Sequence, residues 1–137
     1  MKITDILYKE AMKAYKEGEV PVGCVIVCNN KIISKAHNKK QKSHLTINHA
    51  EIIAISQAQK EKKDWRLDDC ELYVTLEPCK MCKEVIRQSR IKKVYYFIET
   101  KFNNEEGKKI DYEIIKNNNL EKEKYLKLIK DFFETKR

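Results

Sequence analysis

The sequence lacks any long apolar run, whereas a helix that crosses a bilayer needs about 20 consecutive apolar residues. Its first residues, Met1-Lys2-Ile3-Thr4, also lack the apolar core of a secretory signal peptide. No internal repeat is visible, which excludes a solenoid of stacked repeats. We therefore expect an unexported, cytoplasmic protein.

The length and composition suit one compact domain over residues 1–137. Of the 137 residues, 42% are hydrophobic, and two separate cores from so short a chain would each be too small. The formal net charge is +8, from 29 Lys and Arg against 21 Asp and Glu, and such a surplus attracts nucleic acid. The alternative is that the lysines are solvated and have no partner.

Cysteine occurs in an odd number, five, at positions Cys24, Cys28, Cys70, Cys79 and Cys82. A disulfide framework is not expected in an unexported chain, so metal binding or buried thiols are the better interpretations. Cys24 and Cys28 share one face of a predicted strand and are expected to be packing residues. Cys70 lies at a loop-to-strand junction and has no evident partner.

Turn residues and apolar periodicity divide the chain into helices and strands. Strands are expected over residues 20–27, 31–36, 72–76, 94–98 and 112–115, and helices up to Gly18 and over residues 49–62, 79–89 and 120–136. The first two strands form a hairpin through Asn29-Asn30, and the strand over residues 20–27 is apolar enough to be buried on both faces. This order predicts a mixed sheet covered by helices.

The local details of two helices are also predicted. Thr4 or Asp5 is expected to cap the first helix, and Asn48 is expected to cap the helix over residues 49–62. The apolar positions of that second helix are Ile52, Ile53 and Ile55. Residues 38–48 are polar and are expected to form a loop.

Two short motifs carry the chemistry: His49-Ala50-Glu51 and Pro78-Cys79-Lys80-Met81-Cys82. Each begins a predicted helix, and cysteines three residues apart lie on one helix face, so both sulfurs can reach one ion. The helix N-terminus favours the thiolate form that a metal needs. A histidine from the other helix completes a three-ligand set that leaves one zinc position open, as in catalytic sites.

Each part of these motifs has a simpler interpretation on its own. Cys79 and Cys82 alone would suit a redox pair, half of a zinc knuckle or chance. His49 alone would suit a histidine at a helix cap, and Glu51 alone an ordinary first-turn carboxylate. Together, H-x-E and P-C-x-x-C are the signature of zinc-dependent nucleobase deaminases. In that chemistry zinc lowers the pKa of its bound water to about 7, and hydroxide attacks the ring carbon while Glu51 shuttles protons.

The sequence resembles the bacterial tRNA adenosine deaminases, which convert the wobble adenosine of an anticodon to inosine. The resemblance covers most of the chain, through Glu19-Val20-Pro21-Val22-Gly23, Asn29-Asn30, Asn38, Thr75-Leu76-Glu77-Pro78-Cys79-Lys80-Met81-Cys82, Ser89-Arg90-Ile91 and Asp131-Phe132-Phe133. It implies a three-layer α/β/α fold of the cytidine-deaminase type, with a mixed sheet of about five strands and helices on both faces. The last two strands are then expected to be parallel.

The resemblance also implies one zinc ion per chain, bound by His49, Cys79 and Cys82, with Glu51 as the catalytic proton shuttle. It implies a tRNA anticodon stem-loop as substrate and a homodimeric assembly. The residues that it assigns to substrate binding are Asn38, Val22, Glu77, Pro78, Phe132 and Phe133. The two phenylalanines have an alternative role as core residues, and His37 and His44 are expected in a loop that faces the site.

Three segments depart from the family. Lys83-Glu84-Val85 follows Cys82 where the family has small residues, which bears on helix packing or a subunit contact. Leu45-Thr46-Ile47-Asn48 replaces a proline-containing approach to His49. Residues 100–111 are shorter than usual and lack an Asp-x-Lys-x-Gly pattern, with Lys101 as a candidate substitute, in a segment that lies near the RNA in relatives.

Two other functions stay open. A deaminase of a free base, nucleoside or nucleotide, of the guanine, cytosine or deoxycytidylate type, would share both motifs. Asn38, the motif over residues 19–23 and Phe132-Phe133 favour RNA over that alternative. A non-catalytic RNA-binding subunit could keep zinc for stability, but a structural site has no need for Glu51.

Overall fold

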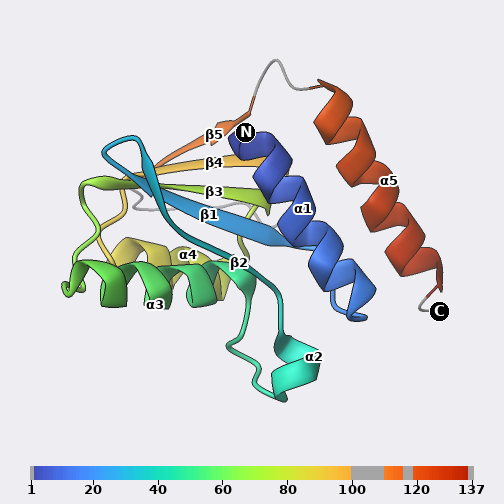
Figure 1. Cartoon of the computed structure of the whole chain (residues 1–137), viewed down its shortest axis with the longest axis horizontal. Coiled ribbons are helices and arrows are strands. Elements are labelled where there is room, and N and C mark those ends of the chain that lie inside the picture. The colour runs from blue at the N-terminus through green and yellow to red at the C-terminus, as the bar shows by residue number, and fades with distance from the viewer. Residues whose placement is uncertain (1, 100–109, 116–118, 136–137) are drawn as a thin grey trace.

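The computed structural model describes residues 2–99, 110–115 and 119–135 (Figure 1). The strands are β1 (Gly23–Cys28), β2 (Lys31–His37), β3 (Cys70–Leu76), β4 (Lys93–Ile98) and β5 (Asp111–Ile114). The helices are α1 (Ile3–Lys16), α2 (Lys40–Ser43), α3 (Ala50–Lys62), α4 (Lys80–Gln88) and α5 (Asn119–Thr135). Every strand and helix expected from the sequence is present, with small shifts at the ends.

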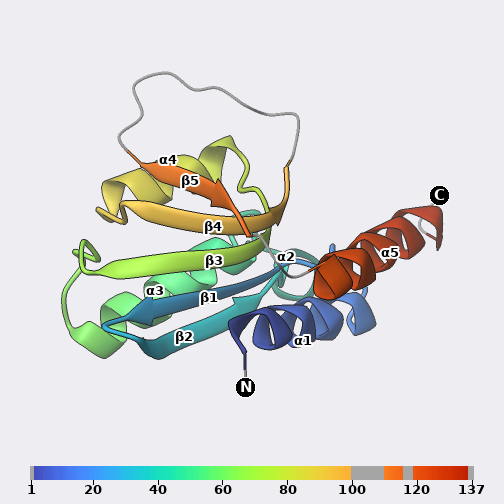
Figure 2. The same cartoon turned by 90° about the horizontal axis from the view of Figure 1, so that it is seen from above.

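The five strands form one mixed sheet in the order β2-β1-β3-β4-β5 (Figure 2). β1 is antiparallel to both of its neighbours, β2 and β3. The pairs β3–β4 and β4–β5 are parallel, which confirms the expected arrangement of the last two strands. Asn29 and Asn30 join β1 to β2 with φ angles of 53° and 65°, the left-handed conformation of a two-residue hairpin turn.

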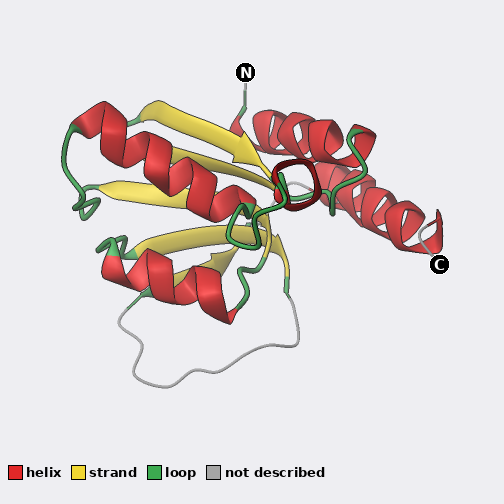
Figure 3. Ribbon diagram, turned by 90° about the horizontal axis from the view of Figure 1, so that it is seen from below, coloured by secondary structure: helices red, strands yellow, loops and turns green. Residues whose placement is uncertain are grey.

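Helices cover both faces of the sheet, so the expected three-layer arrangement is confirmed (Figures 1 and 3). α3 and α4 cover one face, and α1 and α5 cover the other. β1 shows the division well, because Cys24, Ile26 and Cys28 belong to the core under α3 and α4, whereas Val25 and Val27 belong to the core under α1 and α5. All six residues of β1 are buried, as its apolar sequence predicts.

The start of β1 touches α1 so closely that only glycine fits there. A Cβ atom added to Gly23 would lie 2.6 Å from the Leu7 carbonyl oxygen and 2.8 Å from the Cβ atom of Glu10. The backbone N–H of Gly23 donates to Thr75 Oγ1 at 3.1 Å, which ties β1 to β3 at the same point. The loop before Gly23 is thereby held against the end of the sheet where α3 begins.

The expected helix caps are wrong. Lys2 precedes α1 and His49 precedes α3, and neither residue makes a side-chain capping bond. Thr4 and Asp5 lie inside the first turn of α1, and the Asn48 side chain donates to Ser43 Oγ at 2.9 Å instead. The cap of α3 comes from outside the helix, because Asn38 Oδ1 accepts the Ala50 N–H at 2.7 Å.

Two further expectations need correction. Residues 38–48 are not all loop, because they contain the short helix α2. The face of α3 that packs on the sheet is made largely of alanine, with Ala50, Ala54, Ala58 and Ile55 buried. Of the expected apolar positions, Ile55 is buried and Ile53 packs partly buried against this core, whereas Ile52 is partly buried and is not among the core residues. A helix that lies close to a sheet needs small residues at the contact. In the described part of the chain, no helix has the length and apolar content needed to cross a membrane.

Candidate active site

Three side chains of types that can bind a metal meet where α3 and α4 begin. β2 and β3 run in the same direction, so the segments that follow them lie at one edge of the sheet. His49 immediately precedes α3, Cys79 immediately precedes α4, and Cys82 lies in the first turn of α4. The Nδ1 atom of His49 lies 3.9 Å from Cys79 Sγ and 3.6 Å from Cys82 Sγ.

These separations fit one zinc ion. With Zn–S bonds of about 2.3 Å and Zn–N bonds of about 2.0 Å, tetrahedral geometry sets the ligand atoms about 3.5–3.8 Å apart. The three ligand atoms here lie within 4.8 Å of one another. Among the described residues the group offers three ligands, one fewer than a closed structural site, which leaves a position for a reacting molecule.

The surroundings of the two cysteines favour a thiolate at Cys79 and a thiol at Cys82. A hydrogen bond from Cys82 lowers the pKa of Cys79 to about 5 against the opposing effect of burial, and the backbone N–H groups of Cys82 and Met81 contribute to the decrease. The same hydrogen bond, together with burial, raises the pKa of Cys82. Binding of a metal to both sulfurs therefore requires the release of a proton from Cys82.

Glu51 lies two residues after His49, in the first turn of α3, and is only 4% exposed. Burial raises the pKa of its carboxyl to about 7, a hydrogen bond from its own backbone N–H opposes the rise, and the Cys79 thiolate adds to it. A carboxyl with a pKa near neutrality can both accept and return a proton. The geometry thus combines a metal site with an acid–base group.

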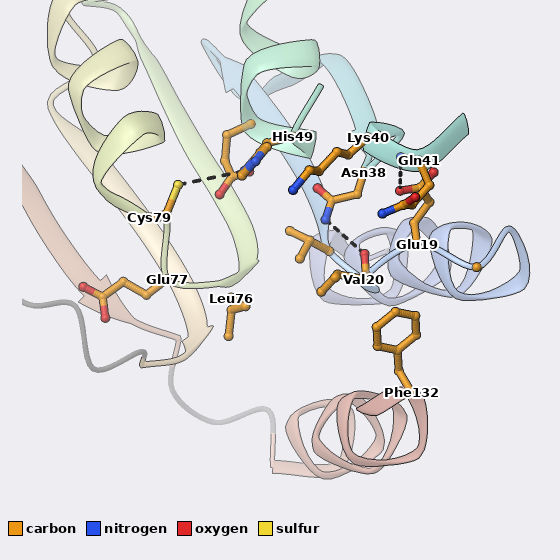
Figure 4. A pocket seen from close by; sticks show the side chains of 13 residues that line it. Glu19, Val20, Asn38, Lys40, Gln41, His49, Leu76, Glu77, Cys79 and Phe132 are labelled. Atoms are coloured by element: carbon orange, nitrogen blue, oxygen red, sulfur yellow. Dashed lines mark hydrogen bonds between the residues drawn. The ribbon is translucent and has the colours of Figure 1, made fainter. Parts of the chain in front are cut away.

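A cavity of about 260 Å³ opens beside these residues (Figure 4). Its walls come from the loop between α1 and β1, from the segment of Asn38 and α2, from the end of β3, and from α5. The lining residues are Gly18, Glu19, Val20, Val22, Asn38, Lys40, Gln41, His49, Glu51, Leu76, Glu77, Cys79 and Phe132. Pockets for drug-sized ligands hold about 300–1,000 Å³, so this cavity suits a single small ring system.

Asn38 connects the cavity wall to α3. Its Nδ2 group donates to the Val20 carbonyl at 3.1 Å (Figure 4). Its Oδ1 atom accepts the Ala50 N–H at 2.7 Å. The loop before β1 and the start of α3 are therefore fixed to each other through one side chain. Because His49 immediately precedes Ala50, this also fixes the backbone that carries a candidate metal ligand.

Glu19 organises the other wall of the cavity and is 1% exposed. Its carboxylate accepts the backbone N–H groups of Gln41 at 3.0 Å and Lys42 at 2.7 Å, which holds α2 over the cavity. Glu19 belongs to the motif over residues 19–23 of the sequence. Its role could not be predicted, because it depends on the position of α2 in the fold. Val20, Lys40, Gln41 and Leu76 line the cavity as well and were not predicted as site residues.

Most of the predicted substrate-binding residues lie at the cavity. Val22, Asn38, Glu77 and Phe132 line it, and Glu77 pairs with Lys83 at 2.8 Å. Pro78 is buried and is not among the lining residues. The two predicted phenylalanines differ in exposure, because Phe132 is 7% exposed whereas Phe133 is 51% exposed. Phe132 packs edge-on against Tyr15 of α1, at 6.4 Å between ring centroids.

The two histidines that flank Asn38 do not line the cavity. His37 is the last residue of β2 and is buried, with Nδ1 3.0 Å from Glu10 and Nε2 3.2 Å from Glu17. His44 is exposed and ends α2 with a φ angle of 60°. The expectation that both face the site is therefore wrong, because the loop begins only after His37.

The remaining cysteines lie away from the cavity lining. Cys24 and Cys28 are buried in the core under α3 and α4, as expected of packing residues. Cys70 does have a partner, since it lies opposite Cys28 in the β1–β3 ladder. Residues 100–109, which hold most of the shortened segment and Lys101, lie outside the described part of the chain.

Known proteins are similar to this chain in sequence and in fold. A tRNA-specific adenosine deaminase of Bacillus subtilis (strain 168) is 48% identical over 88 residues, which make up 64% of this chain and 55% of that protein. The chain thus spans about half the length of this curated relative.

Two solved structures extend the likeness to the whole fold. A chain from a study of A-to-I editing by tRNA:A34 deaminases at the wobble position of transfer RNA has a TM-score of 0.75 and 29% identity, and the match covers 81% of this chain and 95% of that one. A guanine deaminase from Bacillus subtilis has a TM-score of 0.67 and 28% identity, over 93% of this chain and 94% of that one.

The candidate zinc ligands and Glu51 all fall within one family match. Residues 1–98 match the family described as the cytidine and deoxycytidylate deaminase zinc-binding region. That region includes α1, the strands β1 to β4 and both helices that begin at the metal site. The chain belongs to the cytidine and deoxycytidylate deaminase family, which is defined by this zinc-binding region.

Proposed function

We propose that this chain is a zinc-dependent hydrolase that deaminates adenosine to inosine at the wobble position of a tRNA anticodon loop. The observation that carries the proposal is that Glu51, a buried carboxylate, shares one small cavity with His49 and Cys79 of the candidate metal site. The 48% identity to a tRNA-specific adenosine deaminase supports adenosine in tRNA as the substrate.

In the proposed reaction, His49, Cys79 and Cys82 would hold the zinc ion, which would supply a nucleophile from water at neutral pH. Glu51 accepts a proton from the attacking water and delivers it to the ring nitrogen beside the reacting carbon. Glu51 then takes the remaining proton from the added hydroxyl group and delivers it to the amino group, which departs as ammonia. Water is consumed, the amino group is replaced by oxygen, and Glu51 returns to its starting state.

Substrate binding is proposed to use the walls of the same cavity. Val22 and Phe132 offer apolar surface to a base, and Asn38 and Glu77 offer polar groups. A base in an anticodon loop is easily unstacked and turned into a pocket, which keeps the cost of binding low. The net charge of +8 and the exposed ring of Phe133 suit contact with the rest of the loop.

The decisive experiment measures inosine in an anticodon stem-loop that carries adenosine at the wobble position. The wild-type chain loaded with zinc should form inosine, and Glu51→Gln should lower turnover by about 10²–10⁴-fold while it retains zinc. Absence of inosine with the wild-type chain would reject the proposal. Turnover that is equal in the two proteins would reject the role of Glu51.

A free-base deaminase is the second candidate, because a guanine deaminase shares 28% identity and nearly the whole fold. Guanine, cytosine, cytidine and free adenosine should therefore be assayed beside the stem-loop. Turnover of one of them without any RNA product would favour this candidate. Bound zinc with no turnover on any substrate would favour a non-catalytic RNA-binding subunit.

We also propose that the chain forms a homodimer and acts in the cytoplasm, where tRNA is modified. The exposed apolar side chains of Leu45 and Ile47, which are 51% and 54% exposed, offer surface for a subunit contact close to His49 in the sequence. Light scattering of the purified chain tests the assembly. A monomeric mass at micromolar concentration would reject it.

A further inference from the structure

A second cluster of metal-binding groups lies at the other end of β1 and β3. Cys28 ends β1, Cys70 begins β3, and the two residues are direct partners in the antiparallel ladder. The Cys28 thiol donates to Asp69 Oδ2 at 3.2 Å, and the Cys70 thiol lies 3.5 Å from Asp69 Oδ1. The three ligand atoms lie within 4.8 Å of one another, the same limit that is met by His49, Cys79 and Cys82.

We propose that Cys28, Asp69 and Cys70 form a second metal site, which takes a thiophilic divalent cation such as Zn²⁺. Two thiolates and a carboxylate are ligands that zinc accepts, and thiolates disfavour magnesium and calcium. Cys28 is 8% exposed and Cys70 is 3% exposed, so the sulfurs are shielded from bulk water. Asp69 is exposed, which gives an ion a path from the surface.

Lys62 balances the charge of this second metal site. Its ammonium group forms an ion pair with Asp69. The hydrogen bonds from Lys62 and then from Cys28 lower the pKa of Asp69 to about 2, so the carboxylate is ionised at neutral pH. Two thiolates and one carboxylate, together with a divalent cation and one ammonium group, have a net charge of zero, which favours a bound ion at a partly buried position.

Binding at the second metal site proceeds by exchange of protons for the ion. Burial raises the pKa of Cys70, so its sulfur carries a proton in the free protein. The cation forms two metal–sulfur bonds, and one proton leaves each thiol for the solvent. No oxidant or reductant is needed, and the affinity should increase with pH because two protons are released.

The second metal site is separate from the candidate active site. α3 has 13 residues, with His49 just before it and Lys62 at its end, so the two sites lie about 20 Å apart. Figure 1 shows the β1–β2 turn and the start of β3 beside the C-terminal end of α3, away from α2. Substitution of Cys28, Asp69 or Cys70 therefore leaves the cavity residues in place.

The test is the number of metal ions that the full chain binds. The protein, kept under reducing conditions, is dialysed against Zn²⁺ or Cd²⁺, and bound metal is measured by elemental analysis. We expect two ions per wild-type chain and one in the Cys28→Ser/Cys70→Ser variant. Asp69→Asn should weaken the second ion by more than about tenfold, because even outer partners of metal ligands contribute about 10–100-fold to affinity.

Asp68→Asn is the matched control, since Asp68 is an exposed neighbouring carboxylate outside the cluster. It should bind two ions with wild-type affinity, and all variants should deaminate the stem-loop as the wild type does if the proposed function holds. Circular dichroism checks that each variant folds. If the double cysteine variant does not fold, the affinity of Asp69→Asn for the second ion provides the test.

An equal number of bound ions in the wild type and in the double variant would overturn the second metal site. A Cys28–Cys70 disulfide in the reduced, metal-loaded protein, detected as a mass lower by two hydrogens, would also overturn it. The difference in bound metal does not depend on any substrate, so its result is independent of the deaminase assay.

Discussion

Among single residues, Asn38 connects the cavity proposed to bind the substrate most directly to the structure around it. Its side chain uses one donor for Val20 and one acceptor position for Ala50. A primary amide has two N–H groups and an oxygen with two lone pairs, so one donor and one acceptor position are left for a ligand. Asn38 can therefore hold α3 and the loop before β1 while it contacts a base.

Two substitutions at Asn38 separate these roles. Asn38→Ala removes both hydrogen bonds and should lower the free energy of unfolding by about 1–3 kcal/mol, as well as turnover. Asn38→Asp keeps an acceptor for the Ala50 N–H but loses the bond to the Val20 carbonyl, so it should recover only part of the stability, and it also loses the donors that a base would use. Urea unfolding and kcat/KM on the stem-loop measure the two effects. Wild-type stability of the alanine variant would contradict this account.

The residues of the candidate site differ in how far the sequence could predict them. His49, Glu51, Cys79 and Cys82 could be predicted because metal and proton chemistry restricts both residue type and spacing. Glu19 could not, because its partners are backbone N–H groups of α2, and a backbone group leaves no mark in the sequence. A buried carboxylate becomes evident only when its partners are known.

At the scale of elements, the contact between α1 and the end of β2 stabilises the wall behind the cavity. Glu10 of α1 is 4% exposed and lies 3.0 Å from His37 and 2.9 Å from Lys13. Burial raises the pKa of Glu10, but the hydrogen bonds with His37 and Lys13 outweigh it, so the pKa lies below the ordinary value of 4.5. Glu10 is therefore charged in the folded protein at neutral pH.

This lowered pKa predicts a dependence of stability on pH. A carboxyl whose pKa is lowered by folding adds stability above its unfolded pKa and loses it as the pH falls through the folded value. Stability should therefore decrease below about pH 4.5, and Glu10→Gln should make that decrease shallower. Urea unfolding at a series of pH values measures both slopes. An identical acid slope in the variant would show that Glu10 does not contribute.

The contact of β1 with α1 predicts a sensitive glycine. Gly23→Ala would bring a methyl group against the backbone of α1 at Leu7, and neither element can move freely. We expect a loss of about 1–3 kcal/mol in the free energy of unfolding, which is typical of overpacking. Ser56→Ala, on the exposed face of α3, is the control and should unfold like the wild type. A Gly23→Ala variant of wild-type stability would contradict the close contact.

The order and type of the elements could be predicted more fully than their packing. Apolar runs, helical periodicity and the Asn29-Asn30 turn indicate the sheet and its helices. On α3 the expected Ile55 and Ile53 do contribute to the core, but the helix lies so close to the sheet that Ala50, Ala54 and Ala58 make most of the contact. Closeness between layers depends on the whole fold, and a local pattern of hydrophobicity does not report it.

At the scale of the whole molecule, a metal ion would join two separate parts of the chain. His49 belongs to the segment after β2, whereas Cys79 and Cys82 belong to the segment after β3. An ion bound only by the folded protein stabilises it by about 4 kcal/mol when its free concentration is 1,000 times Kd. Removal of the metal should therefore lower both stability and turnover.

Dialysis against a chelator tests this prediction. The metal-free protein should have a lower Tm and no deaminase activity, and added zinc should restore both. Glu51→Gln is the control, because it should gain the same thermal stability from zinc without any gain in activity. Wild-type activity after complete removal of metal, checked by elemental analysis, would contradict the zinc-dependent mechanism.

The spacing of the three candidate ligands along the chain has a consequence for how the protein matures. Cys79 and Cys82 are close in the sequence and can bind an ion before the chain has folded. His49, in contrast, lies 30 residues before Cys79. It meets them only after β1 has inserted between β2 and β3, which is a long-range step. An ion captured early would have an incomplete set of ligands and would exchange readily. The complete set of three ligands therefore requires the assembled sheet.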